Sequence, residues 1–216
     1  MGQLEYKMSY RRNLPHIQPP GATMFVTYRL FGSIPDDICQ KLITEAERID
    51  CELDQIKDYK KRIQQGYLEQ ERMFAKWDNF LNVATIDPYW LADERIAKIV
   101  TDSLHYLHGR LCDLQAYCVM SNHVHVLFTP LLKDKQITKY YPLSKIMHDH
   151  KRHTARQANK ILEREGQFWE HESYDHFVRD DRELQRILIY ILNNPVKAGL
   201  VEQWSDWKWT YCRTSL

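Results

Sequence analysis

Two histidines spaced one residue apart lie inside an apolar run that is typical of a β-strand. His123 and His125 flank Val124 in the segment AYCVMSNHVHVLFT. Because the side chains of a strand alternate between its two faces, both imidazoles are expected on one face of a sheet. Val124, Val126 and Phe128 are then expected on the opposite face, against a core. Two imidazoles on one strand supply half of the ligands of a divalent-metal site.

A second pair with the same spacing, His148 and His150, lies in the polar stretch MHDHKRHTARQANK. This stretch lacks the alternation of a strand and indicates a helix with a solvated face, so we do not expect a ligand pair there. Since the chain has ten histidines, one such pair can arise from composition alone. The apolar surroundings of His123 and His125 favour the first pair.

A chemical partner for the first pair lies in LQRILIYILNNPVKAGLV, residues 184–201. Its apolar residues recur at helical spacing, and Asp180 and Asp181, just before this segment, suit the dipole at the start of the helix. We expect this helix to end near Asn194, because Pro195 disfavours helical geometry in the residue before it. Tyr190 and Asn194 are four residues apart and therefore share a face.

A phenol and an amide on one helix face can complete the histidine site. Tyr190 would then be a nucleophile, and the Asn194 oxygen a third metal ligand. The alternative is structural, with Tyr190 as a core residue whose hydroxyl reaches the rim and Asn194 as the helix C-cap. Only the histidine pair favours the chemical interpretation over the structural one.

Several segments in this order resemble the REP-associated tyrosine transposases, which are single-tyrosine members of the HUH transposases. They are VMSNHVHVLF, the basic helix after it, GQFWEHESYDHFVRDDREL and YILNNPVKAGLV. The amino-terminal YRRNLPHIQPPGATMFVTYRLFGSIP resembles the family's opening strand and its lead-in, whereas residues 35–81 match only loosely. Ser121 stands where the family commonly has proline, a departure that changes no chemical group.

The resemblance implies a divalent cation, magnesium or manganese, held by His123, His125 and Asn194, with Tyr190 as the nucleophile. It also implies a 5′-phosphotyrosine intermediate, a free DNA 3′-hydroxyl, and rejoining without ATP. Repeated extragenic palindromes are the first candidate substrates.

Two points stay open at this stage. Tyr174 is the runner-up nucleophile. A phenol with a pKa near 10 needs help to ionise, and His176 and Lys197 are both near enough in sequence to give it.

The composition suggests an intracellular globular enzyme. Hydrophobic residues make up 44% of 216, which is enough for a sizeable core. The five cysteines contain no CxxC motif and suggest reduced thiols. No apolar run approaches membrane-spanning length, and the amino terminus lacks a secretory segment. We therefore expect a cytoplasmic protein with no membrane partner and no nucleotide cofactor.

The net charge of +1 argues against a general nucleic-acid binder, but the distribution of charge matters more. Residues 133–164 contain nine bases and three acids, and Lys7, Arg11 and Arg12 form a basic arm. Such stretches can contact phosphates, although a solvated helix face explains any single residue equally well. We expect single-stranded or hairpin DNA as partner, contacted by Arg11, Arg12, Lys145, Lys151, Arg152, Arg156 and Lys197.

The expected elements alternate in the order of the split βαβ plan, with an antiparallel sheet. In chain order they are a strand at 24–30, a charged helix or helical hairpin at 35–73, a helix at 89–110, strands at 113–120 and 123–130, a basic helix at 143–162, an extended segment at 168–178 and the tyrosine helix. We predict an α+β, ferredoxin-like (RRM-like) HUH fold with a helical insertion after the first strand.

We expect a single HUH transposase-like domain over residues 1–216. Its parts are a basic arm at 1–22, the insertion at 35–80, the catalytic tyrosine helix at 180–194 and a tail at 195–216. Monomer and homodimer stay open.

Two other functions fit part of this pattern. A non-catalytic single-stranded nucleic-acid binder would use aromatic side chains on an RRM-like sheet and would be indifferent to Tyr190→Phe. A metal-dependent hydrolytic nuclease would activate water with the histidines and form no covalent intermediate. The combination of both histidines, the tyrosine and the asparagine favours transesterification.

Overall fold

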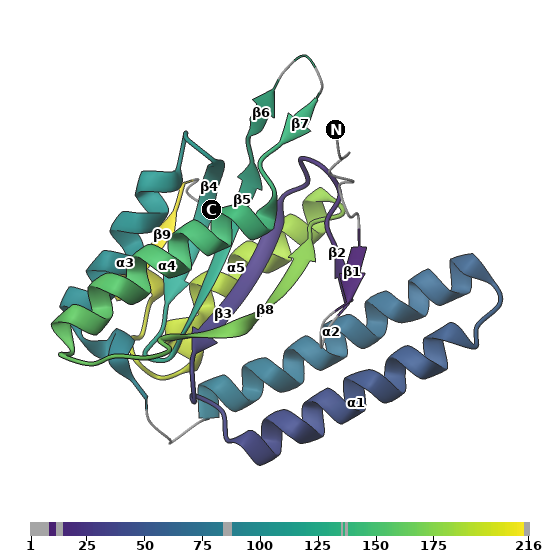
Figure 1. Cartoon of the computed structure of the whole chain (residues 1–216), viewed down its shortest axis with the longest axis horizontal. Helices are drawn as coiled ribbons and strands as arrows, with labels where there is room; N and C mark the ends of the chain where they lie inside the picture. Colours follow the sequence, from purple (N-terminus) through teal and green to yellow (C-terminus); the bar gives the residue numbers. More distant parts are fainter. Residues whose placement is uncertain (1–8, 12–14, 84–87, 135, 137, 214–216) are drawn as a thin grey trace.

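A five-stranded antiparallel sheet forms the centre of the molecule, with the strand order β8-β3-β5-β4-β9 (Figure 1). The computed structural model describes residues 9–11, 15–83, 88–134, 136 and 138–213. The sheet strands are β3 (Met24–Leu30), β4 (Cys112–Val119), β5 (His123–Pro130), β8 (Trp169–Phe177) and β9 (Thr210–Cys212). The first four adopt the split βαβ arrangement. The predicted α+β fold with an antiparallel sheet is confirmed.

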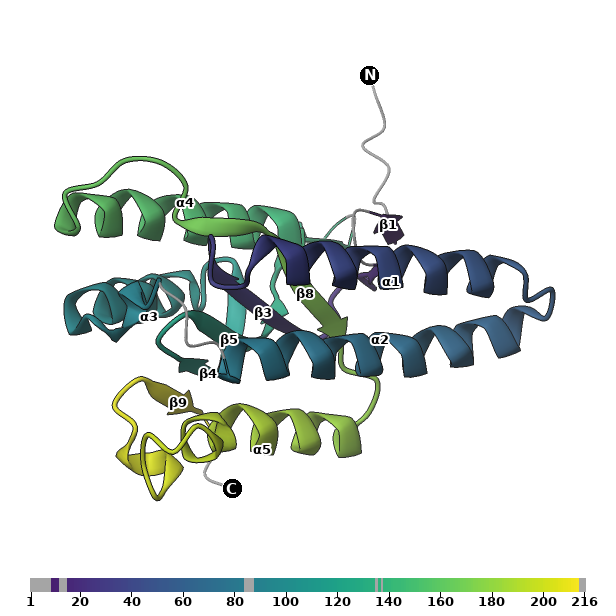
Figure 2. The same cartoon turned by 90° about the horizontal axis from the view of Figure 1, so that it is seen from below.

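Helices cover both faces of this sheet (Figure 2). Helices α3 (Glu94–Leu107) and α4 (Leu143–Ile161) pack on one face, and α5 (Asp181–Lys197) packs on the other. Val124 and Val126 belong to the core under α3 and α4, whereas Leu127 packs with Ile191 of α5. The alternation of β5 therefore separates the two cores, as its sequence predicts.

A long helical hairpin follows β3 and extends beyond the sheet (Figures 1 and 2). It consists of α1 (Asp36–Asp54) and α2 (Tyr59–Val83). The two helices share an apolar cluster of their own, with Leu42, Ile49 and Met73 at its centre. The hairpin is thus a separately packed unit that meets the sheet through one face of α2.

Short elements complete the chain. Strands β1 (Ser9–Arg11) and β2 (Pro15–Ile17) pair with each other, as do β6 (Leu132–Asp134) and β7 (Lys139–Tyr140). The 3₁₀ turns are η1 (Trp90–Ala92) and η2 (Trp204–Asp206). Strand β9 lies in the segment that we expected to be a tail, and it pairs with β4 at the sheet edge. No helix in the described ranges combines the length and the apolar character needed to cross a membrane.

The prediction that the tyrosine helix ends near Asn194 is wrong, because α5 continues to Lys197 with Pro195 inside it. A proline in the last turn removes only one helical hydrogen bond, so the turn survives. Gly199, two residues after the end of the helix, has a left-handed φ of 69°. The amides of Gly199 and the next residue donate to carbonyls of the last turn at 2.9 Å, which is the Schellman arrangement.

The solvated face predicted for the second histidine pair is wrong for one of its members. His148 is exposed, but His150 is only 1% exposed. The His150 ring contacts the Tyr28 hydroxyl at 2.6 Å and the Ser103 hydroxyl at 2.9 Å. Because α4 turns this residue toward β3 and α3, His150 is a hydrogen-bonded core residue. The two members of the pair therefore do not share a site.

We predict that His150→Ala lowers the free energy of unfolding by about 2–4 kcal/mol. The substitution leaves two buried hydroxyls without a partner and opens a cavity. The exposed His148→Ala should change stability by less than about 0.5 kcal/mol. Urea denaturation of both variants measures the difference, and equal stabilities would contradict the core assignment of His150.

Candidate metal and nucleophile site

The two histidines of β5 lie side by side on the face that α5 covers. Their Nε2 atoms are 3.0 Å apart, and their rings meet edge to face. His123 is 1% exposed and His125 is 0% exposed. The prediction that both imidazoles share one face, opposite Val124 and Val126, is confirmed.

Hydrogen bonds at the other ring nitrogens fix both imidazoles. His123 Nδ1 donates to the Asn122 amide oxygen at 2.7 Å, which leaves its Nε2 as a lone-pair donor. His125 Nδ1 lies 2.7 Å from the hydroxyl of Thr27, its cross-strand neighbour on β3. Asn122 in turn donates to the Leu81 carbonyl of α2 at 3.1 Å.

Burial keeps both rings uncharged. It lowers the pKa of His123 to about 3, with a further contribution from His125. Burial also lowers the pKa of His125 to about 3, and the positive charge of Lys197 adds to this. Neutral imidazoles are the form that binds a metal ion, so both Nε2 atoms are available as ligands at neutral pH.

Helix α5 brings Tyr190 and Asn194 to the same place. The Tyr190 ring lies edge-on to the His125 ring, with 5.2 Å between the centroids. The Tyr190 hydroxyl is buried, and the pKa of this phenol is raised, first by burial and then by the negative charge of Asp78. Asn194 is 1% exposed. Its side chain is close enough to raise the pKa of His125 and to lower that of Tyr190. The shared helix face is therefore the one that meets the histidines.

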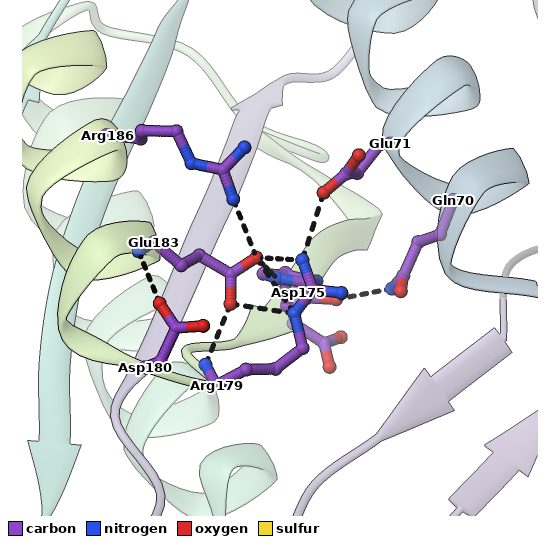
Figure 3. A network of polar contacts seen from close by, with 8 residues as sticks. Gln70, Glu71, Asp175, Arg179, Asp180, Glu183 and Arg186 are labelled. Atoms are coloured by element: carbon purple, nitrogen blue, oxygen red, sulfur yellow. Dashed lines mark hydrogen bonds and ion pairs between the residues drawn. The ribbon is translucent and has the colours of Figure 1, made fainter. Parts of the chain in front are cut away.

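Polar contacts fix the start of α5 (Figure 3). Asp180 caps the helix by accepting from the Glu183 amide at 2.8 Å. Glu183 binds the Arg179 guanidinium and lies 3.0 Å from His176 Nε2. Burial would raise the pKa of Glu183, but the hydrogen bonds from Arg179 outweigh it and lower this pKa to about 2. Arg179 also reaches Glu71 of α2, so the network joins β8, α5 and the hairpin.

A carboxylate that the sequence patterns did not single out completes the site. Asp78 of α2 is 3% exposed, and its Oδ1 lies 3.5 Å from His125 Nε2. Ligand atoms of Asp78, His123 and His125 all lie within 4.8 Å of one another. In the part of the chain that the structure describes, no other group of three or more His, Cys, Asp or Glu side chains has this arrangement.

A signal for Asp78 was present in the sequence. Phe74, Asp78 and Leu81 follow the helical spacing of an apolar stripe, in which a charged residue is out of place. A charge on such a stripe indicates that it faces a polar site and not a core.

The donor set fits a divalent cation. Two nitrogen ligands 3.0 Å apart match adjacent positions around a six-coordinate ion with bonds of about 2.1 Å. The amide oxygen and nitrogen of Asn194 are buried without a well-formed hydrogen bond, which costs about 1–3 kcal/mol unless a ligand satisfies them. Imidazole nitrogens and amide or carboxylate oxygens are both ligand types for divalent cations. The residues present therefore could hold a metal ion.

A small cavity of about 160 Å³ leads to the edge of the Tyr190 ring. Aromatic rings form much of its wall, with Phe25, Phe74 and Tyr174 around Tyr190. Tyr174 stacks on Phe74 at 4.3 Å, and burial raises the pKa of its phenol. His176 also lines this cavity, whereas Lys197 lies on the other side, 3.9 Å from Asp78 Oδ2.

The predicted DNA-contact residues do not gather around Tyr190. Lys145, Arg152 and Arg156 are exposed on α4, on the opposite face of the sheet. Lys151 is partly buried, and its amine donates to the Ser173 hydroxyl at 2.6 Å and the Glu170 carbonyl at 2.9 Å.

Two of the remaining contact residues lie in the amino-terminal arm. Arg11 belongs to β1, and Arg12 lies outside the described residues. Lys197, at the end of α5, is the predicted contact residue that reaches the site.

Comparison with known proteins supports the resemblance found in the sequence. Residues 91–194 match the family model described as IS200-like transposase. A Haemophilus influenzae protein assigned to the REP-associated tyrosine transposases is 33% identical over 98 residues, which cover 44% of this chain and 56% of that protein. The chain thus matches little more than half of this relative's length.

A solved structure, that of a REP-associated tyrosine transposase bound to a REP hairpin, shares the fold. Its TM-score is 0.50 at 17% identity, and the match covers 93% of this chain and 80% of that one. The predicted resemblance to REP-associated tyrosine transposases is confirmed. The family match contains both histidines, Tyr190 and Asn194, whereas Asp78 lies before it.

Proposed function

We propose, from the match of residues 91–194 to the IS200-like transposases, that this protein cuts and rejoins single DNA strands through a phosphotyrosine. The observation that carries the proposal is the position of Tyr190. Its phenol lies against His125 and beside Asn194, so a nucleophile and three nitrogen or oxygen ligands meet in one place. A core tyrosine would not need a pair of uncharged imidazoles held with their Nε2 atoms together.

In the proposed reaction, Tyr190 Oη attacks a DNA phosphorus in line with the 3′-oxygen. The Tyr190 phenol gives up its proton as the new P–Oη bond forms and the P–O3′ bond breaks. The departing 3′-oxygen takes up one proton, so the step releases none overall. The products are a 5′-phosphotyrosine and a free 3′-hydroxyl. A second 3′-hydroxyl can attack this phosphotyrosine and restore a phosphodiester, so rejoining needs no ATP.

His123, His125 and Asn194 would hold the divalent cation. When bound, such an ion acts as a Lewis acid that stabilises negative charge on the phosphate oxygens. Thr27 and Asn122 hold the two rings in the orientation that this requires. Burial and the negative charge of Asp78 both raise the pKa of the Tyr190 phenol, so the phenol is protonated in the site as described.

We propose single-stranded or hairpin DNA as the substrate, and the structural relative bound to a REP hairpin supports this. In-line attack needs an accessible strand, which a hairpin junction offers without the melting of a duplex. Lys197, exposed beside the site, is placed to contact a phosphate next to the scissile one. Arg152 and Arg156 would contact a more distant part of the DNA, since α4 lies on the other face.

We predict that Tyr190→Phe abolishes the covalent protein–DNA adduct and leaves DNA affinity nearly unchanged, because only the hydroxyl is removed. Tyr174→Phe is the matched control and should still form the adduct. Denaturing gels of each variant with hairpin DNA and manganese measure this. Peptide mapping of the adduct to Tyr174 would overturn the assignment, and strand cleavage by Tyr190→Phe would favour a hydrolytic nuclease.

The metal requirement gives a second prediction. His123→Ala and His125→Ala should each remove most of the metal-dependent cleavage, since the remaining ligands hold a hard cation poorly. His148→Ala should cleave like the wild type, because this histidine is exposed on α4. Cleavage assays with added manganese or excess chelator test this, and full activity in chelator is the result that contradicts a metal site.

Substrate preference gives a third prediction. A hairpin strand should compete for binding much better than a perfect duplex of the same sequence at fixed salt. Replacing Arg152 and Arg156 with alanine should weaken binding and reduce the salt slope by about one for each DNA phosphate that the protein no longer neutralises. Lys151 is left unchanged because its amine holds β8. Equal competition by duplex would show that the proposed substrate is wrong.

A further inference from the structure

A buried carboxylate reaches the proposed metal site from outside the matched transposase region. Asp78 lies on α2, whereas His123 and His125 lie on β5. Placing a carboxylate in a protein interior is costly unless positive charge or a metal ion lies beside it. Asp78 Oδ1 lies 3.5 Å from His125 Nε2, and ligand atoms of Asp78, His123 and His125 lie within 4.8 Å of one another. This grouping of one buried carboxylate with two imidazoles is the arrangement of a metal-binding site.

The chemistry of the donor set points the same way. His123, His125 and Asn194 contribute neutral ligand atoms, so they offset none of the charge of a divalent ion. Asp78 supplies negative charge from within 4.8 Å of a ligand atom of each histidine. A carboxylate oxygen is also the ligand type that magnesium and manganese prefer.

Because Asp78 lies on α2, a cation that it binds together with the β5 histidines would connect the hairpin to the sheet. The α1–α2 hairpin has its own apolar cluster and meets the rest of the protein mainly through side chains of α2. These contacts include Gln70 donating to the Asp175 carbonyl at 3.1 Å and the ion pair of Glu71 with Arg179 at 3.1 Å. A cation bound by Asp78 and the β5 histidines would add a strong link between the hairpin and the sheet.

We infer that Asp78 is a ligand of the same cation as His123 and His125, and that this cation fastens the α1–α2 hairpin to the sheet. The inference rests on the proposed metal site and adds a ligand and a conformational effect to it. Metal binding and hairpin docking are then linked, so each strengthens the other.

The first experiment measures manganese affinity of the full chain without DNA, by electron paramagnetic resonance of the free ion. Asp78→Asn should weaken binding by roughly 10- to 100-fold, because it removes a charged ligand but keeps the side-chain shape. Asp78→Glu keeps the charge but moves the oxygens, so it should also bind more weakly if the carboxylate coordinates the ion. Glu69→Gln is the control on the same helix, because Glu69 pairs with Gln65 and Arg72 of α2 itself, and it should bind manganese like the wild type.

The second experiment follows hydrogen exchange of α2 with and without manganese. Manganese should slow exchange across residues 59–83 in the wild type and in Glu69→Gln, but not in Asp78→Asn. This readout does not depend on DNA cleavage. It also tests the wild-type chain directly, so it decides the matter even if Asp78→Asn fails to fold.

The outcomes separate this inference from the proposed function. A wild-type chain that binds manganese, with unchanged affinity in both Asp78 variants, would overturn the role of Asp78 alone. Manganese binding that leaves α2 exchange unchanged would overturn the link to the hairpin. A wild-type chain that binds no manganese at all would instead remove the metal site itself.

Discussion

The candidate site depends on two uncharged imidazoles that are held in place inside the protein. Each ring is fixed through Nδ1, His125 by Thr27 and His123 by Asn122, so that both Nε2 atoms face the same point. Burial makes this possible, because it keeps the rings neutral at physiological pH. The orientation of the His125 ring also depends on the sheet register, because Thr27 of β3 lies directly opposite His125. A one-residue shift of β5 would turn both rings into the opposite core.

The position of Tyr190, the proposed nucleophile, depends on how α5 is fixed at its two ends. The Asp180 cap and the Glu183–Arg179 contacts hold its first turn, and the Gly199 turn closes its last one. Between them, Leu188 and Ile191 pack on the sheet and set the rotation of the helix. That rotation directs Tyr190 and Asn194 to the histidines. The contacts of Asp180, Glu183 and Arg179 therefore help to position the candidate site, although none of these residues is a proposed ligand.

Local patterns in the sequence were enough to predict four of the five sheet strands, the order of the long helices and the histidine face, because each of these follows from periodicity. Strand β9 lies in the predicted tail and was not predicted. The surroundings of His150 were not predictable, since they depend on hydroxyls of β3 and α3 that are distant in sequence. The end of α5 was misjudged because a proline in the last turn costs only one hydrogen bond. Asp78 was missed because its segment matches the transposase family only loosely, and its importance depends on where the hairpin packs.

One helix both covers the proposed nucleophile and brings a carboxylate to the candidate metal site. The Tyr190 hydroxyl is buried, and Phe74 and Asp78 of α2 both contact this residue. The α1–α2 hairpin has an apolar cluster that is separate from the two sheet cores. The packing of one face of α2 therefore sets both the position of Asp78 beside the histidines and the cover over Tyr190, so a change in that packing alters the two together.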